Sequence, residues 1–206
     1  MRSAIWYFDF ISPFAWIGLR RLKELPHDVS IEYRPVLFAG ILGHWGQKGP
    51  AEIPTKRRYT YRWSHWWAQS QGIALRYPAG HPFTPIHHLR LALACGCRRD
   101  AIQRIFESIW TTGADAGAAF SPLMKELGVK PEEIEKPEIK NGLRTNTEEA
   151  IKRGVFGVPT LEIDGELFWG ADSMEFAKAF LQDPSVLRNA EIQRLDGLPV
   201  AAARKA

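Results

Sequence analysis

The junction between the first strand and the first helix constrains the fold of this chain more than any other stretch. The segment 4–11 is short and nearly all aromatic or β-branched, which is typical of a buried strand. Ser12 suits the N-cap of a helix, and Pro13 suits its first position, where the missing N–H costs nothing. The helical pattern stops at Pro26, and residues 30–36 show a second strand pattern. This β-α-β order predicts two parallel strands joined by a right-handed crossover.

The middle of the chain, residues 40–142, has a different pattern. A loop rich in glycine and proline is expected over 40–54, and strand signals are nearly absent after it. Helical patterns follow over residues 56–72, 84–96, 99–112, 116–127 and 131–135. The sequence therefore predicts a helical insertion subdomain.

An α/β pattern resumes in residues 143–206. Thr147 is expected to cap a short helix that ends at Gly154, and strands are expected over 159–163 and 166–169. The Asp-Gly pair between these strands is a strong two-residue hairpin turn.

The order of these elements predicts one fold class. A β-α-β unit, a helical insert and an α-β-β-α unit make an α/β protein with a thioredoxin-type fold that a helical domain interrupts. We expect a discontinuous thioredoxin-like domain over residues 1–39 and 143–206, with the helical insertion over 40–142.

Composition limits the class of partner. Of the 206 residues, 45% are hydrophobic and 24% are charged, as in ordinary globular proteins. No apolar run approaches the roughly 20 residues that cross a bilayer, and the first residues lack the apolar core of a secretion signal. We therefore expect a cytoplasmic protein without a membrane partner. The net charge of +4 permits nucleic acid on charge alone, but no recognised binding motif supports it, and an anionic small ligand suits the same charge.

The cysteine and histidine residues predict neither a disulfide scaffold nor a metal site. Cys95 and Cys97 are the only cysteines, and such a pair at the end of an apolar helical run is expected to be buried packing. The nearby histidine pair does not offer the spacing for a third and fourth zinc ligand. Surface or packing roles are expected for four histidines, His44, His81, His87 and His88.

The chemistry of the strand-to-helix junction is the open question. A thiol-disulfide protein carries Cys-x-x-Cys there, whereas this chain has Ser12 and Ala15 at the two cysteine positions. Four stretches bear on it, FDFISPFAWIG (8–18), GPAEIPTKRRY (49–59), GVFGVPT (154–160) and FWGADSMEF (168–176). Together they resemble the 2-hydroxychromene-2-carboxylate isomerases, a family of the DsbA-like superfamily beside the kappa-class glutathione transferases, and the similarity runs over residues 5–181. The resemblance implies a thioredoxin-like (DsbA-type) fold with a helical insertion, and a sulfur atom supplied by bound glutathione.

For Ser12 the resemblance implies a catalytic role. The thiolate is the nucleophile, and a free thiol with a pKa near ~8.5 is mostly protonated at neutral pH. The start of a helix favours an anion, and a hydrogen bond to a charged group contributes about 1.5–3 kcal/mol. Ser12 is therefore the expected stabiliser of the glutathione thiolate. The alternative is an N-cap alone, which uses the hydroxyl oxygen as an acceptor.

Val158 and Pro159 resemble the cis-proline turn of the thioredoxin superfamily, which lies opposite the helix start. Such a turn exposes the backbone of the preceding residue, so that glutathione can pair with it as an added strand. The alternative is an ordinary trans proline that begins an edge strand.

The resemblance places the γ-glutamyl end of glutathione at Ala171, Asp172 and Ser173. Backbone N–H groups there are expected to hold its carboxylate, while Asp172 pairs with its ammonium. Ala171 and Ser173 stand where relatives often have a polar residue and an arginine, so both depart from the family pattern. The alternative is that Asp172 only caps the next helix, whose start is favoured by the D-x-x-E spacing up to Glu175.

Lys56 matches the lysine of the family's P-x-K motif and is expected to reach the glycine carboxylate of glutathione or the substrate acid. The alternative is an exposed residue at a helix start. Gln47 stands where relatives usually have asparagine, and Thr84 replaces another frequent asparagine. The contact of Gln47 with glutathione and the identity of the substrate therefore stay open.

The resemblance implies a glutathione-dependent isomerase that converts the chromene hemiketal acid to trans-o-hydroxybenzylidenepyruvate in naphthalene-type catabolism. Its partners would be glutathione and a small aromatic acid, and family members are often homodimers. Two alternatives stay open: a kappa-like glutathione transferase or peroxidase acting on electrophiles, and a glutathione-binding module without chemistry. A protein disulfide oxidoreductase is the least favoured class, because Ser12 and Ala15 occupy both cysteine positions.

Overall fold

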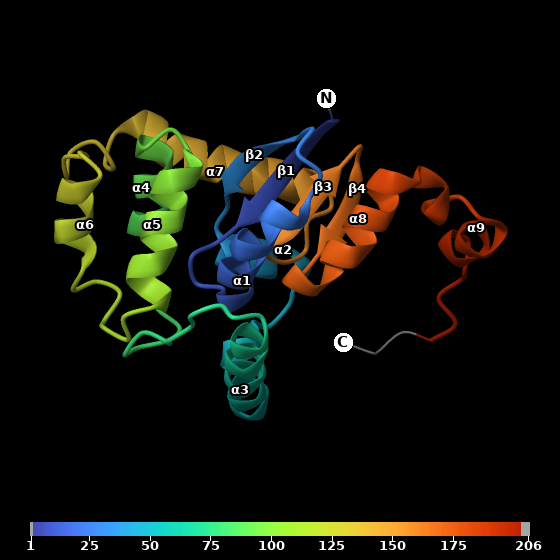
Figure 1. Ribbon diagram of the computed structural model, residues 1–206, viewed down its shortest axis with the longest axis horizontal. Helices are drawn as coiled ribbons and strands as arrows, with labels where there is room; N and C mark the ends of the chain where they lie inside the picture. Colours follow the sequence, from blue (N-terminus) through green and yellow to red (C-terminus); the bar gives the residue numbers. More distant parts are fainter. Residues whose placement is uncertain (1, 203–206) are drawn as a thin grey trace.

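A four-stranded mixed sheet with the order β2-β1-β3-β4 lies at the centre of the computed structural model, which describes residues 2–202 (Figure 1). β1 (Arg2–Phe8) and β2 (Val29–Pro35) are parallel, which confirms the predicted β-α-β pairing. β3 (Thr160–Ile163) pairs antiparallel with both β1 and β4 (Glu166–Trp169). The β3–β4 connection is the predicted Asp-Gly turn, in which Asp164 has a φ of 51° and Gly165 a φ of 87°. Positive φ at both positions is the geometry of a tight hairpin turn.

The helices surround this sheet. The α-helices are α1 (Pro13–Arg21), α2 (Phe38–Trp45), α3 (Pro54–Ser70), α4 (Ile86–Ala94), α5 (Arg99–Trp110), α6 (Phe120–Glu126), α7 (Pro137–Lys152), α8 (Met174–Gln182) and α9 (Ala190–Asp196). Short 3-10 helices are η1 (Leu22–Glu24), η2 (Pro50–Glu52), η3 (Ala171–Ser173) and η4 (Pro184–Leu187). We call residues 46–136, which link α2 to α7 and carry α3 to α6, the insertion. The insertion is helical, as the sequence predicts.

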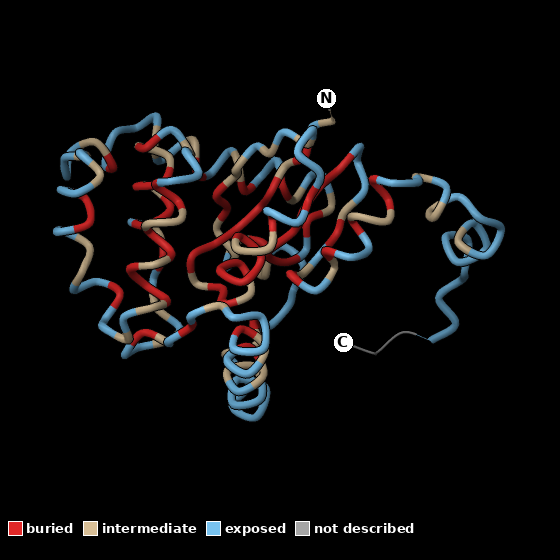
Figure 2. The backbone as a smooth tube through the Cα atoms, viewed as in Figure 1, coloured by how far each residue is buried: buried red, intermediate tan, exposed pale blue. Residues whose placement is uncertain are grey.

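The alternation of side chains along β1 divides the core between two faces of the sheet. Trp6 and Phe8 point to the face that α1 and α8 cover, whereas Tyr7 points to the face that α2 and α7 cover. Figure 2 shows the two central strands, β1 and β3, as mostly buried, while α3 and the segment around α9 are mostly exposed. The sheet is therefore enclosed on both sides, and its carboxyl edge carries the loops that lead into α1 and α2.

Phe106 of α5 joins the insertion to the sheet. Its ring is fully buried, and its centroid lies 4.5 Å from the ring of Phe10, 5.8 Å from Phe8, 6.1 Å from Trp16 and 6.3 Å from Trp6. The apolar cluster on this face contains residues of α4, α5 and α6 together with residues of β1, α1 and α8. The insertion and the sheet thus share one hydrophobic core.

The loop expected over residues 40–54 is wrong in its first part, because residues 38–45 form α2. Gly40 and Gly43 lower the intrinsic helix propensity of this stretch, so the local pattern favoured a loop. Tertiary contacts override that propensity: Ile41 is fully buried, and the N–H of Phe38 donates to the buried carboxylate of Asp9 at 2.9 Å. The helix is stabilised by packing rather than by its own sequence.

The helix expected over residues 131–135 and the cap expected at Thr147 are also wrong. Residues 131–135 form turns, and α7 begins at Pro137, a residue that suits the first helical position. Thr147 lies inside α7, where its hydroxyl donates to the Leu143 carbonyl at 2.8 Å and accepts from the Leu37 N–H at 2.9 Å. The hydroxyl that resembled a cap therefore links α7 to the start of α2.

His88 of α4 is a buried imidazole among aromatic rings. It is 4% exposed, and its ring centroid lies 4.8 Å from Phe120, 6.0 Å from Phe83 and 6.4 Å from Phe10. Burial disfavours the charged form and lowers the pKa of His88 to about 4. The folded protein therefore holds this side chain neutral at pH values where an unfolded chain protonates it.

This difference predicts a loss of stability in acid. Between pH 6.5 and about 4 the unfolded state binds more protons at His88 than the folded state does, so the free energy of unfolding falls as the pH falls. The loss from His88 amounts to roughly 3 kcal/mol across this range. We expect denaturant titrations of His88→Leu to show a flatter acid limb than the wild type.

Asp9 makes the comparison with the wild type necessary. Its burial raises its pKa to about 7, so the folded state binds more protons there between about pH 4 and 7, and Asp9 opposes His88 in this range. Asp9 is present in both proteins, so its contribution cancels when the free energy of unfolding of His88→Leu is subtracted from that of the wild type. Parallel stability profiles for the two proteins would contradict the assignment.

Candidate active site

Asp9 organises the turn between β1 and α1. One carboxylate oxygen accepts from the Ile11 N–H at 3.1 Å, and the other accepts from the Phe38 N–H at 2.9 Å. The carbonyl of Asp9 also accepts from the Ser12 N–H at 3.2 Å. The side chain is fully buried. In the sequence, Asp9 stands out as a carboxyl group within an apolar strand pattern. Its partner in α2, the Phe38 N–H, cannot be read from the sequence.

Ser12 is the N-cap of α1, as the sequence predicts. Its hydroxyl oxygen accepts from the Ala15 N–H at 3.2 Å, and its hydroxyl donates to the Val158 carbonyl at the long distance of 3.4 Å. Capping thus uses the oxygen, while the hydrogen takes part in a weak bond only. The hydrogen can turn toward a better acceptor, such as an anion at the start of α1.

The Val158–Pro159 peptide bond is cis, as the family resemblance implies. This turn lies against α1, because a Cβ at Gly18 would stand only 3.3 Å from Cγ of Pro159. The absence of a side chain at residue 18 therefore allows the close approach. It brings the Val158 carbonyl to Ser12 across 146 residues of sequence.

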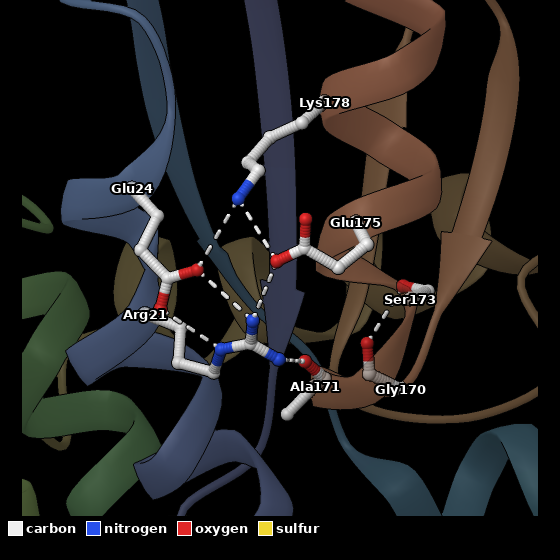
Figure 3. A network of polar contacts seen from close by, with 7 residues as sticks. All are labelled: Arg21, Glu24, Gly170, Ala171, Ser173, Glu175 and Lys178. Carbon is white, nitrogen blue, oxygen red and sulfur yellow. Dashed lines mark hydrogen bonds and ion pairs between the residues drawn. The ribbon is translucent and has the colours of Figure 1, made fainter. Parts of the chain in front are cut away.

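The turn 170–173 lies beside α1 and is held to it by Arg21 (Figure 3). The Arg21 guanidinium donates to the Ala171 carbonyl at 2.9 Å and to the Glu24 carboxylate at 2.9 Å, and it reaches Glu175 at 3.2 Å. The Lys178 ammonium lies 2.8 Å from Glu175 and 3.8 Å from Glu24. This network fixes the start of α8 relative to the end of α1.

Within that turn, Asp172 is exposed and Ala171 is buried. The hydroxyl of Ser173 donates to the Gly170 carbonyl at 2.7 Å, and its N–H donates to the same carbonyl at 3.3 Å. Gly170 has a φ of 91°, a conformation that favours glycine. Ser173 therefore stabilises the turn, and Asp172 is the side chain that the turn presents to solvent.

A helix starts where the D-x-x-E spacing indicates, but its N-cap position falls at Ser173 and not at Asp172. Residues 171–173 form η3, so α8 begins at Met174 and Ser173 takes the N-cap position without a side-chain capping bond. Glu175 pairs with Arg21 and Lys178 instead of reaching back along its own helix. Arg21 was not singled out by the sequence, because its carbonyl partner lies 150 residues away.

Lys56 and Gln47 are exposed, and no hydrogen bond or ion pair within residues 2–202 joins either side chain to the Ser12 turn. Lys56 lies in the first turn of α3 and has no hydrogen-bond or ion-pair partner within residues 2–202. Two helical turns further on, Trp63 packs on Phe14 with ring centroids 5.2 Å apart. Because residues seven apart share a face of a helix, Lys56 lies on the side of α3 that faces the start of α1. Gln47 follows α2, where its N–H donates to the Leu42 carbonyl at 2.9 Å.

The thiols of the chain are not suited to act as nucleophiles. Cys95 and Cys97 are free, and burial raises the pKa of both, that of Cys97 to about 11. The described part of the chain contains no group of three or more His, Cys, Asp and Glu side chains that could hold a metal ion. Among residues 2–202, no helix is both long and apolar enough to span a membrane.

Comparison with known proteins gives one family match. The model of the DSBA-like thioredoxin domain matches residues 5–182. A 2-hydroxychromene-2-carboxylate isomerase of Sphingobium xenophagum is 27% identical over 188 residues, which cover 86% of this chain and 96% of that protein. Glutathione S-transferase kappa 2 of Caenorhabditis elegans is 28% identical over 204 residues, which cover 86% of this chain and 91% of that protein.

A solved structure supports the same fold. The structure of a 2-hydroxychromene-2-carboxylate isomerase superimposes with a TM-score of 0.76 at 22% sequence identity, covering 92% of this chain and 98% of that chain. At this identity the likeness concerns the fold. It agrees with the mixed sheet and the helical insertion described above.

Proposed function

The chain belongs to the DSBA-like thioredoxin domain family, and on this basis we propose that it is a glutathione-dependent 2-hydroxychromene-2-carboxylate isomerase. It would convert the chromene hemiketal acid to trans-o-hydroxybenzylidenepyruvate in the breakdown of naphthalene-type aromatics. The isomerases among its relatives support this choice of reaction.

The observation that carries the proposal is the position of Ser12. In a family whose fold often places a cysteine at the start of α1, this chain has a serine with a weakly engaged hydroxyl hydrogen, next to a cis-proline turn. A nucleophilic sulfur must then come from a bound thiol. Glutathione suits this role, because its peptide backbone can pair with the backbone of Val158 as an added strand.

The start of α1 would keep the bound sulfur ionised. Pro13 has no N–H and the Ala15 N–H already donates to Ser12, so the positive end of the helix dipole is what favours an anion there. The Ser12 hydroxyl adds a hydrogen bond to a charged group, which contributes about 1.5–3 kcal/mol. That contribution lowers the pKa of the thiol by roughly one to two units from ~8.5, so that a large part of it is thiolate at neutral pH.

The remaining contacts bind the two ends of the tripeptide. The exposed carboxylate of Asp172 would pair with the ammonium of the γ-glutamyl group, whose carboxylate would take backbone N–H groups near Ala171. The resemblance assigns Lys56 to the glycine carboxylate or the substrate acid, and Gln47 to a contact with glutathione. These assignments follow the positions of the residues and the family resemblance.

The thiolate explains why a double bond can change its geometry here. When bound, glutathione would supply a thiolate for reversible addition to the conjugated carbon, with the ring oxygen leaving as a phenolate that takes up a proton and the enol losing one as the ketone forms. Ser12 would hold the sulfur, while Asp172 and Lys56 would hold the two ends of the tripeptide. Covalent addition thus removes the barrier to rotation.

A kappa-like glutathione transferase or peroxidase is the second candidate. The observation that favours it is the C. elegans relative, which matches this chain about as well as the isomerases do. Both functions need the same thiolate at Ser12, and only the pocket for the second substrate separates them.

Product analysis tests the proposal. We expect purified protein with 2-hydroxychromene-2-carboxylate and glutathione to yield the trans product without consuming glutathione, and to yield none with S-methylglutathione in its place. A stable glutathione adduct would favour the transferase. The ultraviolet absorbance of the thiolate reports the pKa of the bound thiol. If the protein binds glutathione without turnover and without a lowered thiol pKa, it is a glutathione-binding module without chemistry.

A further inference from the structure

The two peptide groups that precede Ser12 are held by side chains of the insertion. The indole Nε1 of Trp110 donates to the Phe10 carbonyl at 2.9 Å. The imidazole Nε2 of His81 lies 2.8 Å from the Ile11 carbonyl. Trp110 ends α5, and His81 lies in the loop between α3 and α4, so both bonds join the insertion to the turn that leads into α1.

The peptide bond between Ile11 and Ser12 is anchored at both polar ends. Its carbonyl pairs with His81, and its N–H donates to the Asp9 carbonyl at 3.2 Å. With both ends held, the plane of this peptide cannot rotate freely. The plane sets the backbone of Ser12 and therefore the direction of its Cα–Cβ bond, which carries the hydroxyl.

The hydrogen-bond pattern assigns the tautomer of His81. A carbonyl oxygen only accepts, so Nε2 carries the hydrogen and Nδ1 of the neutral ring is an acceptor. The hydroxyl of Tyr61 lies 2.6 Å from Nδ1 and 2.8 Å from the carbonyl of His81 itself. Tyr61 has a single hydroxyl hydrogen for these two acceptors, and it donates to the carbonyl of His81 while its oxygen stays in contact with Nδ1. Burial lowers the pKa of His81, which keeps the ring neutral. The Nε2–H is consequently aimed at the Ser12 turn.

Aromatic packing holds this arrangement in place. The ring centroids of His81 and Trp110 lie 5.5 Å apart, and Tyr77 packs at 5.1 Å from Trp110 and 4.4 Å from Tyr61. The hydroxyl of Tyr77 lies 2.8 Å from that of Ser64 on α3. The two donors therefore belong to one packed group of the insertion, which includes residues of α3 and α5.

From this geometry we propose that His81 and Trp110 are positioning residues for the thiolate site. They hold the turn in which Ser12 presents its hydroxyl, so the insertion completes the site. The proposal rests on the proposed function, because it assigns the two residues to the alignment of Ser12 with bound sulfur. His81 thus has more than the packing role that its sequence context predicted.

The experiment compares His81→Leu with His81→Gln in the full chain. Leucine removes the donor to the Ile11 carbonyl, whereas the amide nitrogen of glutamine can replace Nε2. We expect His81→Leu to raise the pKa of the bound glutathione thiol by roughly one unit and to lower kcat about tenfold to a hundredfold, with little change in the dissociation constant of glutathione. His81→Gln should recover most of both effects.

Three outcomes separate this proposal from the proposed function. If the wild-type protein does not lower the thiol pKa of bound glutathione, both the proposed function and the positioning role are contradicted. A lowered thiol pKa in the wild type that His81→Leu leaves unchanged would overturn the positioning role alone. Equal losses in both variants, in step with their thermal stability, would show a merely structural role and would also overturn it. Should His81→Leu not fold, Tyr61→Phe takes its place, because it removes the hydroxyl that contacts both Nδ1 and the carbonyl of His81, and we expect a smaller rise of the same thiol pKa.

Discussion

Ser12→Ala is expected to lower kcat/KM for 2-hydroxychromene-2-carboxylate by roughly 10- to 100-fold at saturating glutathione. The change removes the hydroxyl that would donate to the thiolate, a bond that contributes about 1.5–3 kcal/mol, and each ~1.4 kcal/mol corresponds to a factor of ten in rate. The pKa of the bound thiol should rise by about one to two units, because the same bond favours the charged form. Steady-state kinetics and the ultraviolet absorbance of the thiolate measure the two effects.

The capping role of Ser12 requires a matched control. Its oxygen accepts from the Ala15 N–H, so alanine also removes a helix cap, which destabilises the protein by about 1 kcal/mol. Glycine is a better N-cap than alanine and lowers stability by only a few tenths of a kcal/mol, yet it lacks the hydroxyl. We therefore expect Ser12→Gly to lose as much activity as Ser12→Ala while remaining more stable.

The comparison of the two variants decides between the catalytic role and the cap. Equal losses of activity with unequal losses of stability identify the hydroxyl as the cause. Activity that follows stability across the pair would assign Ser12 to capping alone. Unchanged kcat/KM and thiol pKa in both variants would contradict the thiolate site.

Phe106→Ala is expected to lower the free energy of unfolding by about 3–5 kcal/mol. The ring is fully buried between β1 and α1, and its removal leaves a cavity at the point where the insertion meets the sheet. Phe176→Ala provides the control, because that ring is 47% exposed and contacts Phe168 at 5.2 Å, and we expect it to lower stability by less than about 1.5 kcal/mol. Denaturant titrations with linear extrapolation measure both values.

The unfolding transition of Phe106→Ala tests the shared core as well. Because one apolar cluster contains residues of the insertion and of the sheet, we expect the two parts to unfold together in a single transition in the wild type. If Phe106→Ala lowers the free energy of unfolding no more than Phe176→Ala does, the central position of Phe106 is contradicted. Two separate transitions in the wild type would show that the insertion folds on its own core.

Local signals account for the elements that the sequence predicted well. The apolar run before Ser12-Pro13 indicated the first strand and helix, and the Asp164-Gly165 pair indicated the hairpin, since each signal lies within a few residues of the structure that it specifies. The cis bond before Pro159 and the glutathione site came from the family resemblance instead. α2 was missed because Gly40 and Gly43 disfavour a helix locally.

Sequence alone determined the order of strands and helices in the thioredoxin part, the parallel pairing of the first two strands and Ser12 as the residue at the helix start, because propensities, caps and turns act between neighbouring residues. Only the tertiary structure decided what holds Ser12 in place. The donors to the Ile11 and Phe10 carbonyls come from His81 and Trp110, which lie 70 and 100 residues further along the chain. A contact across such a separation depends on the packing of the whole insertion against β1, and no local pattern specifies it.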